Sequence, residues 1–295
     1  MIILGAGMAG CLAGFVFSEA TIIEAKDNTA NNHQALLRFR SDKISELTGI
    51  PFEKVTIHKA VWSEGKFAAP SPRISNLYSR KVAGNISERS IHNLASDTRW
   101  IAPENFHQQM INKLKDRISF STPVEKLPIP RPIISTLPIF TLSELLGESL
   151  GKQEVQSSSI WIQKYKVPDA QIYQTVYFPD HNTPIYRASL TKDLLTIESM
   201  EKPSTPQCKE VEYSLGIEGI DSIETFSGEQ KLGKIVPLPD PQRKELLFRF
   251  THKHNIFSLG RFACWRNILM DDVYKDILQI RKMLSQNIYD IRKEM

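Results

Sequence analysis

The first fourteen residues constrain the fold of this chain more than any other segment. A short apolar run ends at Leu4 and is followed at once by Gly5-Ala6-Gly7-Met8-Ala9-Gly10, with a further glycine at position 14. In a strand–turn–helix unit the first glycine allows the tight turn, the second lets the backbone approach a pyrophosphate, and the later ones bring the helix close to the sheet. The amides and the dipole at the helix start favour phosphate. The pattern therefore predicts a dinucleotide site at residues 5–10.

A second apolar strand, Thr21-Ile22-Ile23, ends in Glu24. An acid at this position can accept hydrogen bonds from the ribose of an adenosine. We therefore expect Glu24, with Ala25 and Lys26 directly after it, to border the ribose. This motif alone is also compatible with an NAD-type cofactor. The alternative interpretation without any cofactor is a glycine-rich turn in another kind of α/β protein.

In the rest of the chain the pattern of apolar and polar residues changes near position 157. Alternating apolar and polar segments predict an antiparallel meander over 160–167, 172–178, 185–190 and 194–200. Before it, 85–99 is expected to be partly helical and 117–127 a strand; after it, 211–220 is expected to be helical. Residues 271–289 predict an amphipathic helix at the end of the chain.

Charge and cysteine usage narrow the class of protein. The formal net charge is +4, which is compatible with anionic partners such as nucleic acid but does not require them. Cys11, Cys208 and Cys264 are far apart and odd in number, which argues against a disulfide framework and fits a reducing cytosol. We find no apolar run of membrane-spanning length, no signal peptide and no metal-ligand spacing among the histidines. A cytoplasmic protein without a metal site is expected.

Four segments together resemble one flavoprotein group, which includes the amine oxidases and UDP-galactopyranose mutase. They are GAGMAGCLAG with IIEA, FSTPV, PIISTLP and SLGRFACWRNILMDD. The resemblance implies FAD as the cofactor. It also implies an α/β fold in which a Rossmann-type FAD-binding layer (1–50, 115–145 and 235–295) carries an inserted antiparallel-sheet substrate or cap domain (51–114 and 146–234).

The same resemblance suggests which residues lie near the cofactor. Val124 would lie beside the adenine, and Thr136 would end the strand that crosses near the cofactor. The C-terminal segment would approach the isoalloxazine and ribityl chain through Gly260, Arg261, Trp265, Met270 and Asp271. A helix start at this place would stabilise negative charge on a reduced flavin. Arg38 could reach the flavin phosphates or the substrate, although NTANNHQALLRFR replaces the glycine-rich loop that is usual in the family.

Three segments also look like bacteriophage-encoded members of the group: LLRFRSDKISELTGIPF, PIYRASLTKDLLTIE and SLGRFACWRNILMDD. Some of those members are associated with thymidine hypermodification. The likeness implies an oxidase for a C–N bond, with a small molecule or a modified nucleobase as substrate. One such substrate is the glycinyl adduct of thymine in phage DNA, giving an aminomethyl base. DNA would then be a partner, and the host cytoplasm the location.

Catalytic candidates follow from this chemistry. An arginine is the natural clamp for a substrate carboxylate, and Arg187 is the first choice, with Tyr186 beside it and Arg261 next. An exposed strand arginine is an equally good interpretation of Arg187. Two other functions stay open, a flavin-dependent isomerase like UDP-galactopyranose mutase and a non-catalytic nucleotide-binding module. The sequence leaves the oligomeric state open.

Overall fold

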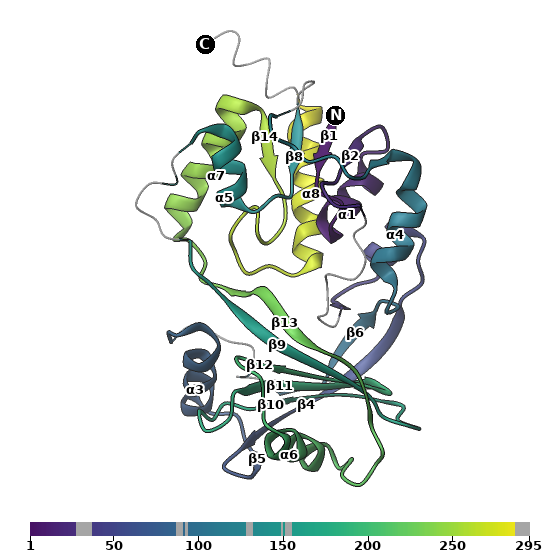
Figure 1. The fold of residues 1–295 in the computed structure, drawn as a ribbon, viewed down its shortest axis with the longest axis vertical. Helices are drawn as coiled ribbons and strands as arrows, with labels where there is room; N and C mark the ends of the chain where they lie inside the picture. Colours follow the sequence, from purple (N-terminus) through teal and green to yellow (C-terminus); the bar gives the residue numbers. More distant parts are fainter. Residues whose placement is uncertain are drawn as a thin grey trace.

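The chain folds into two layers, each built on its own sheet (Figure 1). This computed structural model describes residues 1–27, 37–86, 91, 94–127, 132–148, 150 and 155–286. A parallel five-stranded sheet carries helices on both faces, and a larger sheet lies beyond its carboxyl end. The predicted α/β class with two unlike layers is confirmed.

The parallel sheet has the strand order β14-β8-β1-β2-β7. Its strands are β1 (Ile2–Leu4), β2 (Thr21–Ile23), β7 (Ile118–Ser119), β8 (Ile133–Ser135) and β14 (Ile256–Ser258). Successive side chains point to opposite faces, so Ile3 packs against α1 (Met8–Val16), α4 (Phe106–Leu114) and α8 (Met270–Ser285), whereas Leu4 packs against α5 (Ile139–Leu146) and α7 (Asp240–His254). Both faces are covered, as a parallel sheet requires.

The second sheet has the order β13-β9-β12-β11-β10-β4-β6-β3, with β5 paired to β4. Its strands are β3 (Arg38–Phe39), β4 (Glu53–Ser63), β5 (Lys66–Ala68), β6 (Asp97–Ile101), β9 (Ser157–Lys166), β10 (Ile172–Tyr177), β11 (Ile185–Lys192), β12 (Leu194–Ser199) and β13 (Ile223–Ile235). The meander prediction is correct for β10, β11 and β12 only, because β9 lies beside β12 and β10 pairs in parallel with β4.

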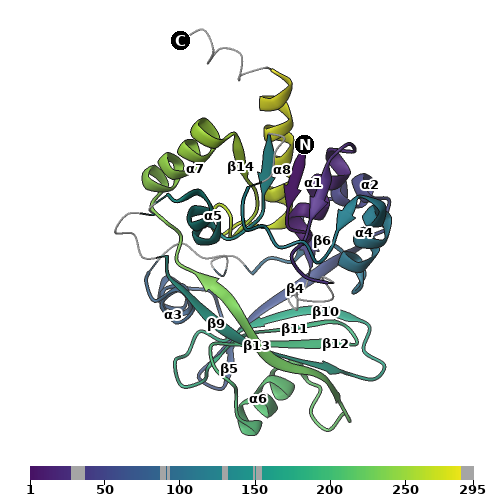
Figure 2. The ribbon, with the colours of Figure 1, turned by 45° about the horizontal axis from the view of Figure 1, so that its top comes forward.

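The two faces of this sheet differ in polarity. Helix α6 (Thr205–Leu215) covers one face, where Val176, Ala188 and Leu195 form an apolar cluster. Figures 1 and 2 show α6 on the side away from the parallel layer. The alternate residues of the same strands, such as Thr175, Ser189 and Thr196, therefore point toward the parallel layer. Helix α3 (Pro72–Ala83) packs beside them on Tyr177.

Some local predictions need correction. Within 85–99, which was expected to be partly helical, residues 97–99 belong to strand β6, because pairing with β4 satisfies their backbone groups. Residues 87–90, 92 and 93 of that segment lie outside the described residues. The helix expected over 211–220 begins earlier, at Thr205, where Ser204 and Gln207 form a capping box, and it ends before Gly216. The strand expected over 117–127 is confined to β7, and a 3₁₀ turn (Lys115–Arg117) precedes it.

Two elements cross the predicted domain boundaries. Strand β3 of segment 1–50 pairs with β6 in the second sheet, and α4 of segment 51–114 packs on α1 in the parallel layer. Short α2 (Lys43–Thr48) is capped at its C-terminus by Gly49 in the left-handed conformation. The last helix is described to Ser285, and its predicted end at 289 lies outside the described residues. None of the described helices combines the length and apolarity needed to cross a bilayer.

Candidate functional site

The glycine loop after β1 is shaped by close packing at two of its glycines. Gly5 has φ +94°, and a Cβ built on it would lie 2.4 Å from Thr136 Oγ1. A Cβ on Gly10 would lie 1.9 Å from the Gly5 carbonyl oxygen. Gly5 N–H also donates to the carbonyl of Ile23 at 2.8 Å, which ties the loop to β2. These positions require glycine for the fold itself.

Gly7 is different, because the fold leaves space beside it. A Cβ built there would meet no atom of the described residues within 4 Å, and its φ of −65° is open to any residue. Helix α1 begins at the next residue, so its first N–H groups have no carbonyl partner within the helix. Bare amides, a helix dipole and open space together form a cradle that fits a diphosphate.

Glu24 stands at the end of β2 beside this cradle. Its Oε2 accepts a hydrogen bond from Ala6 N–H at 2.8 Å, and its Oε1 accepts one from Lys26 N–H at 3.1 Å. A carboxylate has about four acceptor sites, so the two oxygens can still accept from ribose hydroxyls. Ala25 and Lys26 follow Glu24 and are exposed. The placement fits the ribose role expected for Glu24.

The C-terminal glycine turn meets the N-terminal glycine loop. Gly260 follows β14 with φ +97°, and a Cβ built on it would lie 3.0 Å from Ala9 Cβ. Thr136, which ends β8, donates through Oγ1 to the Leu4 carbonyl at 2.7 Å. Segments separated by some 250 positions are thus brought to the same carboxyl edge of the parallel sheet, where open α/β sheets bind ligands.

Helix α8 presents a buried acid at its start. Asp271 Oδ1 accepts from Arg40 N–H at 3.0 Å, whereas its buried Oδ2 has no hydrogen-bond partner among the residues that the structure describes. An unpartnered buried carboxylate oxygen is costly, so this atom fits a hydroxyl of a ligand. Met270, one residue earlier, is half-buried. Val124 is partly buried and packs against the same core cluster as Ile23.

Trp265 does not line the site. Its indole is fully buried in the core that holds Leu4 and Phe250, and its ring packs edge-on against Phe140 with centroids 5.9 Å apart. The ring is enclosed by core side chains of the described residues, so it presents no face to the cofactor site. The expected contact between Trp265 and the flavin is therefore corrected: the indole supports the turn from within the core.

Buried hydroxyl groups and arginines occupy the face of the second sheet that is turned toward the parallel layer. Arg38 donates from Nη1 to Thr175 Oγ1 at 2.5 Å and from Nη2 to Thr191 Oγ1 at 3.2 Å, and Thr175 Oγ1 lies 3.1 Å from Ser189 Oγ. The buried Arg38 Nε has no hydrogen-bond partner in the described ranges of the chain. Burial, and then the positive charge of Arg187, lower the pKa of Arg38 to about 10. This arrangement favours an anion.

Arg187 is an ion-pair partner and not a free clamp. Its Nη2 donates to Glu198 Oε1 at 2.7 Å, and its Nε donates to Glu198 Oε2. Although burial acts to raise it, the charge of Arg187 holds the pKa of Glu198 below its usual value. One-third of the Arg187 side chain remains exposed (35%), so the guanidinium still contributes charge to the face.

Tyr186 reaches the same carboxylate because β11 has a bulge. Ile185 pairs with Ser199 and Arg187 with Glu198, so Tyr186 is the extra residue. Its hydroxyl donates to Glu198 Oε1 at 3.2 Å, and Lys234 Nζ lies 4.0 Å from its ring centroid. The Tyr186 side chain is fully buried. We therefore correct its expected catalytic contact: Tyr186 positions Glu198 and does not touch a substrate.

Arg261 connects the two layers. Its Nη2 donates to the Gly233 carbonyl on β13 at 3.0 Å, while its buried Nε has no partner within the described part of the chain. Burial lowers the pKa of Arg261, and nearby Tyr186 opposes this shift. Arg261 thus lies close to the Tyr186–Glu198 group, and the structure brings the three predicted catalytic residues together with Arg38.

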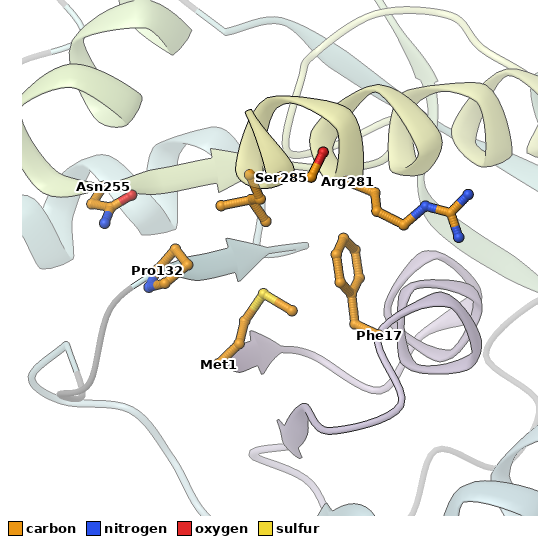
Figure 3. A pocket seen from close by; sticks show the side chains of 7 residues that line it. Met1, Phe17, Pro132, Asn255, Arg281 and Ser285 are labelled. Atoms are coloured by element: carbon orange, nitrogen blue, oxygen red, sulfur yellow. The ribbon is translucent and has the colours of Figure 1, made fainter. Parts of the chain in front are cut away.

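A hollow at the opposite edge of the parallel sheet is separate from this site. It lies where the strands begin and is lined by Met1, Phe17, Pro132, Asn255, Arg281, Leu284 and Ser285 (Figure 3). Ligands of open α/β sheets bind at the carboxyl ends, so this hollow is not the candidate site. Among the described residues, no group of three or more His, Cys, Asp or Glu side chains could hold a metal ion.

Sequence reasoning missed Glu198 and the hydroxyl row of Thr175, Ser189 and Thr196. All four side chains are buried. The available signal was a polar residue at every second position of strands that are otherwise apolar, which indicates a sheet with a polar buried face. Which of these strands would be neighbours could not be read from the pattern.

Solved structures with this fold include several flavoproteins. Reduced UDP-galactopyranose mutase matches with a TM-score of 0.70 at 14% identity, over 97% of this chain and 93% of that one. Aklavinone-11 hydroxylase, in a complex with FAD and aklavinone, matches with a TM-score of 0.53 at 8% identity, over 98% and 62%. A geranylgeranyl bacteriochlorophyll reductase-like protein from Thermoplasma acidophilum matches with 0.51 at 10%, over 98% and 79%.

These likenesses, at such low identities, show a shared fold. No protein-family model and no curated protein match the sequence.

Proposed function

We propose that this chain is an FAD-dependent oxidoreductase that acts on the C–N bond of an amine carrying an anionic group. The observation that carries the proposal is the meeting of Gly260 with Ala9, because it joins the C-terminal turn to the diphosphate cradle. The polar face with Arg38 lies on the other layer, turned toward this junction. The fold shared with flavoproteins supports the choice of cofactor.

The residues of the cradle would hold FAD from its adenosine end to its ring. The amides at residues 7–10 would bind the diphosphate, and Glu24 the ribose. The Asp271 oxygen without a partner would accept from a hydroxyl of the ribityl chain. When bound, FAD would supply the two-electron oxidation of the carbon next to the substrate nitrogen, which prepares this C–N bond for hydrolysis by water.

The chain's own residues would orient the amine. Within the described part of the chain, the carboxylate near Arg38 and Arg187 is that of Glu198, so the two arginines exceed it by one positive charge. An anionic group of the substrate would complete this charge balance. The hydroxyls of Thr175 and Thr191 hold the Arg38 guanidinium in one orientation, which fixes where that anionic group would bind.

A carboxymethylamino group on the methyl carbon of thymine meets these requirements. Oxidation of its glycine Cα–N bond, followed by hydrolysis, would give the aminomethyl base and glyoxylate. The net charge of +4 is compatible with a substrate carried in DNA.

The test starts with apo protein and FAD. We expect a flavin absorbance spectrum after reconstitution, and anaerobic bleaching by 5-(carboxymethylaminomethyl)-2′-deoxyuridine but not by the corresponding N-methyl amine, which lacks the carboxylate. Gly7→Asp should remove FAD uptake and leave the far-UV circular dichroism spectrum unchanged, because the new side chain meets no protein atom at its Cβ. Flavin retained by Gly7→Asp would contradict the placement of the diphosphate.

A second candidate function is a non-redox isomerase that uses reduced flavin. The observation in its favour is the match to UDP-galactopyranose mutase, which covers 97% of this chain and 93% of that one. Turnover of UDP-galactopyranose only after reduction with dithionite, without net oxidation, would support the isomerase and reject the oxidase.

A further inference from the structure

The peptide group between Ala6 and Gly7 is held by side chains from two helices. His107, on α4, has its Nε2 at 2.9 Å from the Ala6 carbonyl oxygen, and Cys11 Sγ on α1 donates to the same oxygen at 3.2 Å. The acceptor is a carbonyl, so His107 must carry its proton on Nε2. Both Ala6 and His107 are buried.

The planarity of the peptide bond gives this contact a consequence at the cradle. The carbonyl of Ala6 and the N–H of Gly7 belong to one peptide plane and point in opposite directions. The carbonyl is drawn toward α4 and α1, so the Gly7 N–H points the other way. A Cβ built on Gly7 also meets no atom of the described residues within 4 Å, so the fold leaves room for a ligand beside this residue.

Without a tether this peptide would be free to rotate. Glycine adopts positive and negative φ about equally well, so Gly7 places little restraint on the peptide before it. A rotated peptide would turn the partly negative Ala6 oxygen toward a diphosphate. On the other side of Ala6, Glu24 already holds the preceding N–H at 2.8 Å.

We propose that His107 is a positioning residue of the dinucleotide site, which holds the Ala6 carbonyl away from the diphosphate and so aims the Gly7 amide at it. The inference rests on the proposed cofactor. It assigns to α4, which carries no part of the glycine motif, a role in cofactor affinity.

The test compares dissociation constants for FAD in four proteins. His107→Leu removes the donor and keeps the bulk, and His107→Gln keeps an N–H donor of similar reach. If the loss of the donor lowers the fraction of loops in the binding-competent state to about one-tenth, Kd rises about tenfold in His107→Leu. In His107→Gln we expect Kd to stay within about twofold of the wild-type value.

Ile111→Ala is the matched control, since Ile111 is buried on the same helix and packs in the core that holds α1. It should lower the melting temperature and leave Kd unchanged. ADP, measured by calorimetry, should show the same fold-change as FAD in His107→Leu, because the affected group is the shared diphosphate. A merely structural role would alter Ile111→Ala and His107→Leu alike.

The outcomes separate the two proposals. If the wild-type chain binds FAD and His107→Leu binds it equally well, the positioning role is overturned and the flavoenzyme remains. A wild-type chain that takes up no FAD would overturn the proposed function, and this role with it. Should His107→Leu fail to fold, Cys11→Ala, which removes the second donor to the same oxygen, replaces it with a smaller expected loss of affinity.

Discussion

The cradle of the parallel layer and the polar face of the second sheet build their sites by different means. The cradle consists of backbone amides and of glycines, which have no side chain, and most of it lies within residues 5–24. The polar face consists of charged and hydroxyl side chains from β3, β10, β11 and β12. A site built from backbone amides requires positions without a side chain, so that a ligand can approach. A site built from side chains requires that the charges buried in it neutralise one another.

The largest effect expected from this contrast is at Gly10. Gly10→Ala places a Cβ 1.9 Å from a backbone oxygen that cannot move without displacing β1, so we expect a loss of about 4 kcal/mol in the free energy of unfolding. Gly7→Ala, three residues away, should leave stability unchanged within about 0.5 kcal/mol. Urea denaturation of the two apo proteins measures both. Equal stabilities would mean that the glycines of the loop are not divided between packing and binding.

The second sheet should respond most to the loss of its buried acid. Glu198→Ala leaves Arg187 without its partner and removes the acceptor of the Tyr186 hydroxyl. Breaking a buried pair from one side costs about 3 kcal/mol, measured as a shift in the urea midpoint. The double variant Arg187→Met/Glu198→Leu should recover most of this loss. If the double variant did not regain stability, the ion pair would stabilise the fold by more than the mutual neutralisation of its two charges.

Arg38 should show opposite effects on stability and on binding. Arg38→Met removes a half-buried cation whose charged form is disfavoured by burial and by Arg187, so we expect the apo protein to gain about 1 kcal/mol. The concentration of carboxylate-bearing amine that half-bleaches the flavin should rise about tenfold, since one charge-assisted contact is lost. Arg40→Met is the control: its partner is Asp272 and its side chain is 48% exposed. Lower stability together with unchanged bleaching would remove Arg38 from the substrate site.

The smallest expected effect is a pH dependence at His107. Burial holds the pKa of this histidine below its ordinary value of 6.5, against the opposing effects of the Ala6 carbonyl and of Glu24, while Cys11 shares the same carbonyl. As pH falls through 6.5 the unfolded chain takes up the proton first, so stability present at neutral pH is lost in acid. Between pH 7 and 5 the wild type should lose about 1 kcal/mol more than His107→Gln. Parallel curves for the two proteins would contradict this.

The parts of the fold that could be predicted are those that depend on interactions between residues close together in the sequence. The glycine loop, the acid at Glu24 and the amphipathic face of α8 are short-range patterns, and all three were found where expected. Strand β6 was missed because its strand character comes from pairing with β4, some 40 residues earlier in the chain. Tyr186 was misjudged because a bulge, which the alternation pattern does not reveal, changed where its hydroxyl points.

By itself the sequence determined the position of the proposed diphosphate cradle. Glycine is needed where the backbone packs closely or must stay accessible, and this requirement can be seen from a few neighbouring residues. The tertiary structure decided everything that depends on distant neighbours. It placed Trp265 in the core, paired Arg187 with Glu198, and brought His107 to the Ala6 carbonyl. Burial sets the strength of each of these interactions, and burial is a property of the packed chain.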